Sequence, residues 1–207
     1  RRRWIDDSCA FFGSLGGDSN AFAETSQQRL PIHDEGLGRE KASCRLGGEE
    51  VIWEKTGIRN LPFNTVFQLL ALQKSSPEVL QAADWMLMIP DYLAWKLCGV
   101  PSNEWTNASS TGLASPSGQG WNLELIKKLG LDGLAIFDKA LTKSGIELGT
   151  VSAAIAEITG LKRDVKVLTC ASHDTASAAA LTPAGAGQVF ISSGTWSLMG
   201  MISEQPL

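Results

Sequence analysis

A carboxylate beside an alanine-rich segment is the first residue whose position suggests chemistry. His173-Asp174-Thr175 follows a short apolar, partly β-branched run, residues 165–169, and leads into an alanine-rich run, residues 175–181. The first run predicts a strand and the second predicts a helix. Because open α/β folds bind ligands where strands end and helices begin, Asp174 is a candidate general base facing a substrate. On position alone, the simpler interpretation is that Asp174 caps the predicted helix.

A second group of small residues follows further along the chain. Ser192-Ser193-Gly194-Thr195 supplies hydroxyls and backbone N–H groups, which are the donors that phosphate oxygens require. Gly194 separates two strand-like runs, so the segment predicts a hairpin that turns on these four residues. A plain hairpin turn is the simpler interpretation of this group taken alone. Together the two groups are more informative, because a phosphoryl transferase needs both a carboxylate and nearby donors for nucleotide phosphates.

Other site types fit these residues poorly. Ser172, His173 and Asp174 are consecutive, and adjacent side chains diverge too much for the hydrogen-bond relay of a hydrolase triad. No Gly-x-Ser-x-Gly motif is present. Tryptophan can stack on a sugar ring, but it is more often a packing residue. None of these tryptophans is therefore assigned to a site: Trp53, Trp85, Trp95, Trp105, Trp121 and Trp196.

The composition narrows the class of protein. The chain has 207 residues, 43% hydrophobic and 19% charged, with a net charge of −4, so it is expected to fold around an apolar core. Its basic residues are mostly scattered, so no nucleic-acid partner is expected. It has no apolar run of membrane-spanning length and no signal-peptide core, so we expect a cytoplasmic protein without a membrane partner. The four cysteines show no metal-ligand spacing, and no metal-ligating residue is predicted.

Helix signals precede the candidate site. An apolar face formed by Phe63, Val66, Phe67 and Leu70 predicts a helix that begins near Leu61. Further helices are predicted from a proline in the first turn or from a polar cap. They begin at Ser76-Pro77-Glu78, at Pro90-Asp91 with an end near Gly99, and at Asn122 with an end at Gly130. Residues 102–120 are expected to form a loop, and residues 1–45 give no firm prediction.

Several segments resemble the FGGY carbohydrate kinases, and among them the rhamnulokinases in particular. The two most specific are Ala171-Ser172-His173-Asp174-Thr175-Ala176-Ser177-Ala178 and Ser192-Ser193-Gly194-Thr195-Trp196-Ser197-Leu198-Met199-Gly200. Further matches occur in the family's order at Gly57-Ile58, Leu61-Pro62-Phe63-Asn64-Thr65, Pro90-Asp91-Tyr92 and Glu104-Trp105-Thr106-Asn107-Ala108. Xylulokinases and glycerol kinases share the aspartate but not this set.

The resemblance, which covers residues 46–207, implies an α/β, ribonuclease H-like (actin-like ATPase) fold, present only in part. Residues 46–183 would be the C-terminal part of the sugar-binding first domain, and residues 184–207 the start of the ATP-binding second domain. By resemblance Asp174 is the catalytic base, His173 and Thr175 contact the substrate, and Gly194 with Thr195 touches ATP. The implied reaction transfers the γ-phosphate of Mg²⁺-bound ATP to O1 of L-rhamnulose.

The chain also departs from the family. The N-terminal strand with its Asp-x-Gly phosphate loop and most of the second domain are missing, and residues 1–45 do not match. We therefore expect an internal fragment that is inactive alone, with residues 1–45 an aberrant or poorly ordered segment. Two alternatives stay open: a kinase for another ketose, such as fuculose or xylulose, and a non-catalytic sugar-binding or interaction module.

Overall fold

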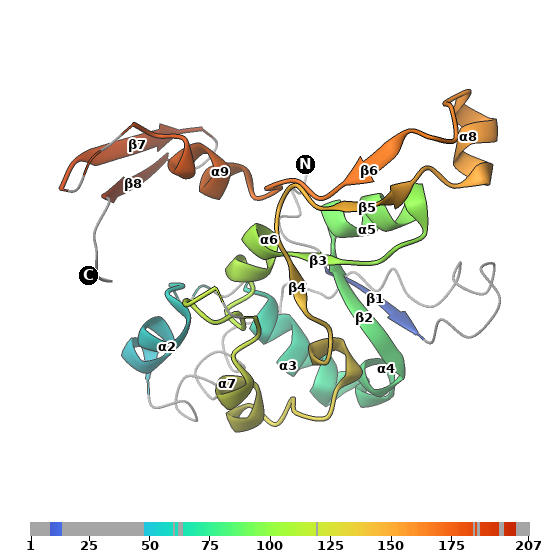
Figure 1. Ribbon diagram of the computed structural model, residues 1–207. Helices are drawn as coiled ribbons and strands as arrows, with labels where there is room; N and C mark the ends of the chain where they lie inside the picture. The colour runs from blue at the N-terminus through green and yellow to red at the C-terminus, as the bar shows by residue number, and fades with distance from the viewer. Residues whose placement is uncertain are drawn as a thin grey trace, which may run out of the picture.

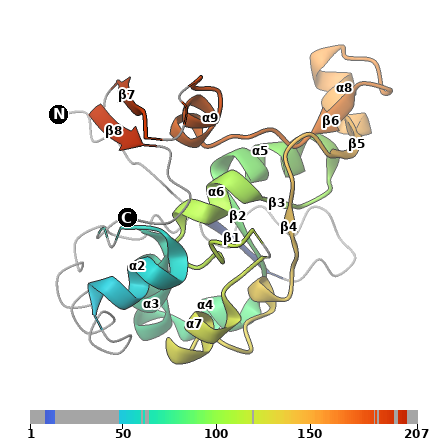
Figure 2. The same ribbon diagram turned by 60° about the vertical axis from the view of Figure 1, so that its left-hand side comes forward.

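The chain forms two regions, which we call the body and the arm. The computed structural model describes residues 9–13, 48–59, 61, 64–118, 120–183, 185, 187–194 and 197–201. The body is residues 48–142, together with the strand at residues 9–13, and the arm is residues 143–201. The arm lies along one side of the body, with a helix at one end and a hairpin at the other (Figures 1 and 2). No helix in the described ranges is long and apolar enough to cross a membrane.

The body is a mixture of short helices and strands. Its elements are β1 (Cys9–Gly13), α2 (Glu49–Thr56), α3 (Thr65–Ser75), α4 (Pro77–Ala82), β2 (Ala83–Met88), α5 (Ile89–Cys98), β3 (Asn103–Glu104), α6 (Trp105–Ser110), α7 (Leu123–Lys128), η3 (Ala135–Phe137) and β4 (Leu141–Thr142). Strand β1 pairs with β2 in antiparallel fashion, and β3 pairs with β4 in parallel fashion.

The arm carries the residues with predicted chemistry. Its elements are β5 (Glu147–Thr150), α8 (Ala153–Thr159), β6 (Lys166–Leu168), α9 (Asp174–Ala180), β7 (Val189–Ser193) and β8 (Ser197–Met201). The predicted strand, helix and hairpin are all confirmed here. The β7–β8 ladder is antiparallel and continues to the Ser193–Ser197 pair, so the turn begins at Gly194 rather than at Ser192.

The predicted helix starts are mostly correct. Helix α3 begins at Thr65, later than the predicted start near Leu61, and it buries Val66 and Phe67, whereas Phe63 lies outside the described residues. Helix α4 begins at Pro77, but the side chain of Ser76 makes no capping hydrogen bond, so proline rather than the serine hydroxyl marks this start. Helix α5 ends at Gly99, whose φ of 79° is the left-handed conformation that glycine adopts at low cost.

Several elements were not predicted, among them β1, β2, β3 and α6. Residues 102–120 were expected to be a loop, yet they contain β3 and α6. The reason is that α6 is capped by Glu104, and glutamate is not one of the usual capping residues. Strand β2 lies directly between two helices without turn residues to delimit it. Strand β1 falls within residues 1–45, for which there was no firm prediction.

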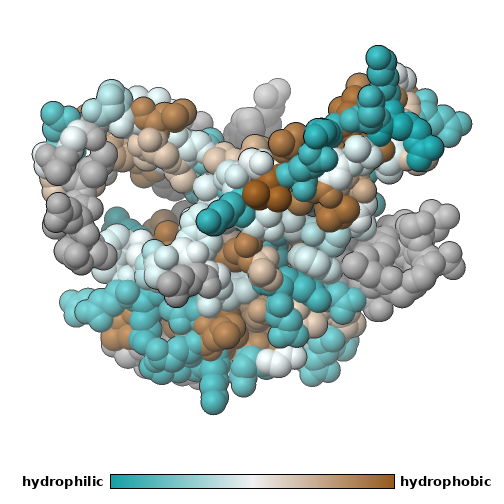
Figure 3. Space-filling view, viewed as in Figure 1, coloured by the Kyte–Doolittle hydropathy of each residue, from teal (hydrophilic) through white to brown (hydrophobic). Residues whose placement is uncertain are grey.

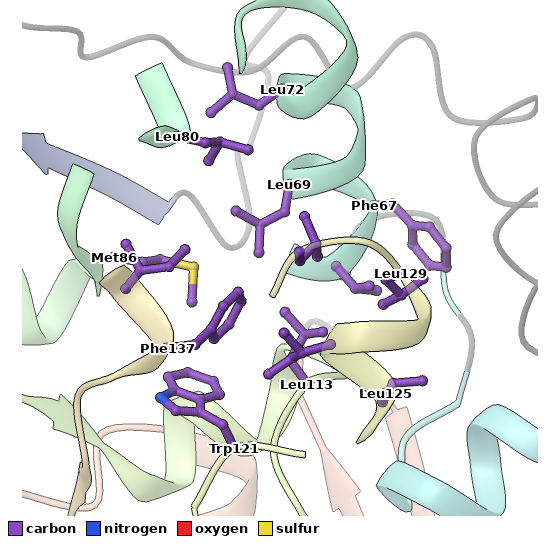
Figure 4. Packing of buried hydrophobic residues seen from close by; sticks show 14 of the residues in the cluster. Phe67, Leu69, Leu72, Leu80, Met86, Leu113, Trp121, Leu125, Leu129 and Phe137 are labelled. Carbon is purple, nitrogen blue, oxygen red and sulfur yellow. The ribbon is translucent and has the colours of Figure 1, made fainter. Parts of the chain in front are cut away.

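One apolar cluster holds the body together. Figure 4 shows side chains from α3, α4, β2, α7 and η3 meeting at its centre. The Trp121 and Phe137 rings pack edge to face with centroids 5.5 Å apart, and the indole nitrogen of Trp121 donates to the Lys139 carbonyl oxygen at 2.9 Å. The indole N–H of Trp121 thus has a hydrogen-bond acceptor inside the cluster, as a buried tryptophan usually requires. The arm rests on this body through contacts of β5 and β6 with α5.

Candidate active site

The predicted catalytic segment lies at the start of α9. His173 is the N-cap residue, and its Nδ1 accepts a hydrogen bond from the Ala176 backbone N–H at 3.2 Å. Asp174 is the first helical residue and its side chain is exposed, with Oδ1 accepting from the backbone N–H of Thr175 at 2.5 Å and from the Thr175 hydroxyl at 3.2 Å. The cap is therefore His173, and the interpretation of Asp174 as the capping residue is wrong. The carboxylate of Asp174 remains accessible from solvent.

The loop between β6 and α9 is anchored to the turn before β5. The buried Thr169 donates its hydroxyl to the Lys143 carbonyl oxygen at 2.7 Å, and the same oxygen accepts from the Ile146 N–H at 2.9 Å. The Thr169 carbonyl oxygen accepts from the Gly145 N–H at 2.8 Å. These bonds fix the chain at the end of β6, five residues before Asp174 in sequence.

The start of α6 meets the other end of this loop. Thr106 Oγ1 accepts from the His173 backbone N–H at 3.2 Å, and the Asn107 side-chain amide donates to the Ser172 hydroxyl. The structure thus places His173 against the first turn of α6, directly before Asp174 and Thr175 in the chain. Figures 1 and 2 both show that the loop leading into α9 passes over α6.

A buried glutamate organises this junction. Glu104 is only 1% exposed, and it caps α6 by accepting from the backbone N–H groups of Thr106 and Asn107 at 3.0 and 3.3 Å. It also accepts from the hydroxyls of Thr106 at 2.5 Å, Ser144 at 2.6 Å and Ser172 at 3.5 Å. Burial raises the pKa of Glu104, but the hydrogen bonds from Ser144 and Thr106 outweigh burial and hold the pKa below its ordinary value. The group is therefore a carboxylate at neutral pH.

A second buried carboxyl group lies behind Glu104. Asp91, in the first turn of α5, is 3% exposed, and its Oδ1 accepts from the Glu104 backbone N–H at 3.0 Å. Burial, together with the nearby charge of Glu104, raises the pKa of Asp91 from 3.8 to about 7, against backbone hydrogen bonds that lower it. Asp91 Oδ2 has no hydrogen-bond partner among the described residues. The junction therefore holds two adjacent carboxyl groups whose pKa values are displaced in opposite directions.

Of the two predicted phosphate-binding residues, Gly194 lies on the hairpin. Gly194 is exposed and directly follows β7, the strand against which α9 packs. Thr195 lies outside the described residues, so its predicted contact with ATP stays a prediction. Within the described ranges no group of His, Cys, Asp and Glu side chains is arranged to hold a metal ion. An exposed glycine next to the Ser193 hydroxyl nevertheless fits the close approach of a nucleotide phosphate.

Sequence reasoning missed the residues that hold the site. Glu104, Thr106 and Asn107 were noticed only as a family match, within a segment expected to be a loop. Their signal was a polar residue with side-chain acceptors directly before a short run of helix-compatible residues, which is the pattern of a helix N-terminus. Ser144, which completes the junction, gives no local signal because its role depends on a contact with a residue 40 positions away.

Comparison with known proteins identifies the family that this chain resembles. Residues 41–180 match the N-terminal domain of the FGGY family of carbohydrate kinases. Rhamnulokinase from Oceanobacillus iheyensis is 38% identical over 159 residues, which are 77% of this chain and 33% of that protein. Rhamnulokinase from Bacteroides thetaiotaomicron is 36% identical over 208 residues, 98% of this chain and 41% of that protein. The predicted resemblance is confirmed, and the chain spans about a third of the length of the curated relatives that it matches.

Solved structures support the fold. The xylulose kinase from Rhodospirillum rubrum superimposes with a TM-score of 0.63 at 22% sequence identity, over 76% of this chain and 32% of that chain. Together with the family match, this likeness confirms the predicted α/β, ribonuclease H-like (actin-like ATPase) fold, present here in part.

Proposed function

The chain belongs to the FGGY family of carbohydrate kinases, and on this premise we propose that it contributes the sugar-binding side of an L-rhamnulose kinase. In this proposal residues 46–183 are part of the first domain and residues 184–207 begin the ATP-binding second domain. The similarity to proteins named rhamnulokinase at 36 to 39% identity supports the choice of sugar. The observation that carries the proposal is the exposed carboxylate of Asp174, the first residue of α9. The loop directly before it is held by hydrogen bonds to the turn before β5 and to α6.

Asp174 acts as the general base in the proposed reaction. Its carboxylate accepts the proton of the O1 hydroxyl of L-rhamnulose as O1 attacks the γ-phosphorus of ATP, and ADP leaves with the pair of electrons from the broken P–O bond. The products are L-rhamnulose 1-phosphate, ADP and the proton on Asp174. His173 and Thr175, which flank the base, are proposed to contact the sugar. Positioning of the two substrates supplies much of the rate in phosphoryl transfer.

Gly194 and Thr195 are proposed to lie against the phosphates of ATP. Glycine at this position leaves room for phosphate oxygens to approach the backbone, and a threonine hydroxyl would add a donor. A Mg²⁺ ion bound with ATP would neutralise charge on the transferred phosphate.

A panel of ketoses tests the proposal. The full-length gene product that carries this sequence is assayed for ADP release with L-rhamnulose, L-fuculose and D-xylulose. Each assay is run with and without a compound that competes with ATP for binding. We expect the highest kcat/KM with L-rhamnulose. Preference for another ketose would change the proposed substrate but support the proposed kinase activity. Sugar binding without sugar-dependent ADP release would contradict the kinase activity and favour a binding module.

A further inference from the structure

We propose that Thr106 is a positioning residue for Asp174, held in its working orientation by the buried carboxylate of Glu104. The inference rests on the proposed role of Asp174 as the base. The single bond that carries it joins Thr106 Oγ1, on α6 in the body, to the backbone N–H of His173, the residue directly before Asp174 in the arm.

The chemistry of Glu104 fixes the direction of this bond. A carboxylate can only accept hydrogen bonds, whereas a hydroxyl has one donor and two acceptor sites. The Thr106 hydroxyl, 2.5 Å from Glu104 Oε2, must therefore point its proton at Glu104 and turn its lone pairs elsewhere. The His173 N–H lies 3.2 Å from the same oxygen and meets those lone pairs. Glu104 thus makes Thr106 an acceptor for the backbone that leads into Asp174.

Glu104 is itself too constrained to move. It is buried, it caps α6 through two backbone N–H groups, and Ser144 of the arm donates to its other oxygen at 2.6 Å. Hydrogen bonds to an ionised acceptor are stronger than those between neutral groups. A parallel contact from the Asn107 amide to Ser172 holds the residue before His173 to the same helix. The segment entering α9 is therefore tied to the body at two consecutive residues, through the Ser172 hydroxyl and the His173 backbone.

The neighbouring bond inside α9 extends this restraint to the base. His173 Nδ1 caps the helix by accepting from the Ala176 N–H, so the orientation of His173 also sets the first turn of α9. Asp174 lies within that turn. Displacement of a reacting group by about 1 Å can cost about 100-fold in rate. Thr106 is consequently expected to affect turnover without touching either substrate.

Three isosteric or conservative variants of the full-length gene product test the inference. Thr106→Val removes the hydroxyl but keeps the shape, Thr106→Ser restores the hydroxyl, and Thr111→Val makes the same change at the far end of α6. Thr111 is a matched control because its hydroxyl is also buried and bonded, to the Ala108 carbonyl oxygen at 2.6 Å, but makes no bond to the arm among the described residues. The measurements are kcat, the KM for L-rhamnulose, and hydrogen exchange in the peptide spanning residues 169–176.

We expect Thr106→Val to lower kcat by about 10- to 100-fold with the KM for the ketose changed less than about 2-fold, because only the transition state loses an aligned base. Exchange in residues 169–176 should accelerate by about 5- to 10-fold, as for the loss of one hydrogen bond. Thr106→Ser should restore both values, and Thr111→Val should change neither. Wild-type kcat and exchange in Thr106→Val, or equal losses in Thr111→Val, would overturn the inference.

The exchange measurement separates this inference from the proposed function. If the wild-type protein phosphorylates no ketose, the kinase proposal fails. Exchange in residues 169–176 then still decides whether Thr106 holds the backbone before Asp174: acceleration only in Thr106→Val supports the positioning role, and unchanged exchange rejects it.

Discussion

In the body many of the large apolar side chains lie inside one cluster, whereas in the arm most of the described ones lie on the surface. Leu69 of α3 is fully buried and packs within the central cluster, but Leu181 after α9 is 85% exposed and Met199 of β8 is 75% exposed. Figure 3 shows hydrophobic surface where β5, β6 and α8 of the arm lie. The body is thus stabilised by apolar burial, whereas the arm is held to it by contacts of β5 and β6 with α5 and by hydrogen bonds at the Glu104 junction.

This difference explains how a site can be precise on an exposed element. Thr169, Ser172 and His173 all bond to residues of the turn before β5 or of α6. A hydrogen bond is directional and a hydrophobic contact is not, so a few buried polar bonds can fix orientation where apolar burial is slight.

The largest expected difference lies between the two regions themselves. Leu69→Ala should lower the free energy of unfolding by about 2–5 kcal/mol, because it leaves a cavity in a closed cluster. The matched change Leu181→Ala should lie within about 0.5 kcal/mol of wild type, since the side chain is exposed. Urea denaturation measures both. Equal losses for the two variants would show that the arm has an apolar core of its own.

The pH dependence of stability tests the polar junction. A carboxyl whose folded pKa of about 7 exceeds its unfolded value of 3.8 binds protons more tightly in the folded state, so its contribution to stability is present below about pH 4 and is lost as the pH rises to about 7. Asp91→Asn removes this titration. From about pH 5 to about pH 8 the wild-type protein should lose about 3 kcal/mol more than the variant. Parallel pH profiles would contradict burial of a titrating Asp91.

The smallest effects concern one helix cap in each region. Asn122 caps α7 of the body by accepting from the Leu125 N–H at 3.1 Å, and its amide also donates to the Lys55 carbonyl oxygen at 2.8 Å. Ser152 caps α8 of the arm through a longer bond of 3.4 Å to the Ile155 N–H. Asn122→Ala should cost about 1 kcal/mol and Ser152→Ala about half as much. Thermal denaturation that ranks the two in the reverse order would argue against the comparison.

Much of the fold could be predicted from local patterns. Helices α3, α4, α5, α7 and α9 and the β7–β8 hairpin were signalled by prolines, glycines and apolar spacing, which act over a few residues. Strand β2 and helix α6 were missed because an unmarked boundary and a glutamate cap carry weak local signals.

The candidate site was predictable only in part, for a related reason. Asp174 and its neighbours lie between a predicted strand and a predicted helix, and local sequence patterns indicate both. Thr106 and Ser144 act through contacts with residues far away in the chain, which no local pattern encodes. His173, predicted as a substrate contact, was not predicted as the cap of α9, because histidine is an unusual capping residue.

The central claim is that the exposed carboxylate at the start of α9 is the base of a sugar kinase. It is tested most directly by Asp174→Asn in the full-length gene product, with Asp164→Asn, an exposed aspartate elsewhere in the arm, as the matched control. The account predicts that Asp174→Asn lowers kcat for L-rhamnulose by about 100- to 10,000-fold while the sugar still binds, and that Asp164→Asn leaves kcat unchanged. Near-normal turnover in Asp174→Asn would contradict it.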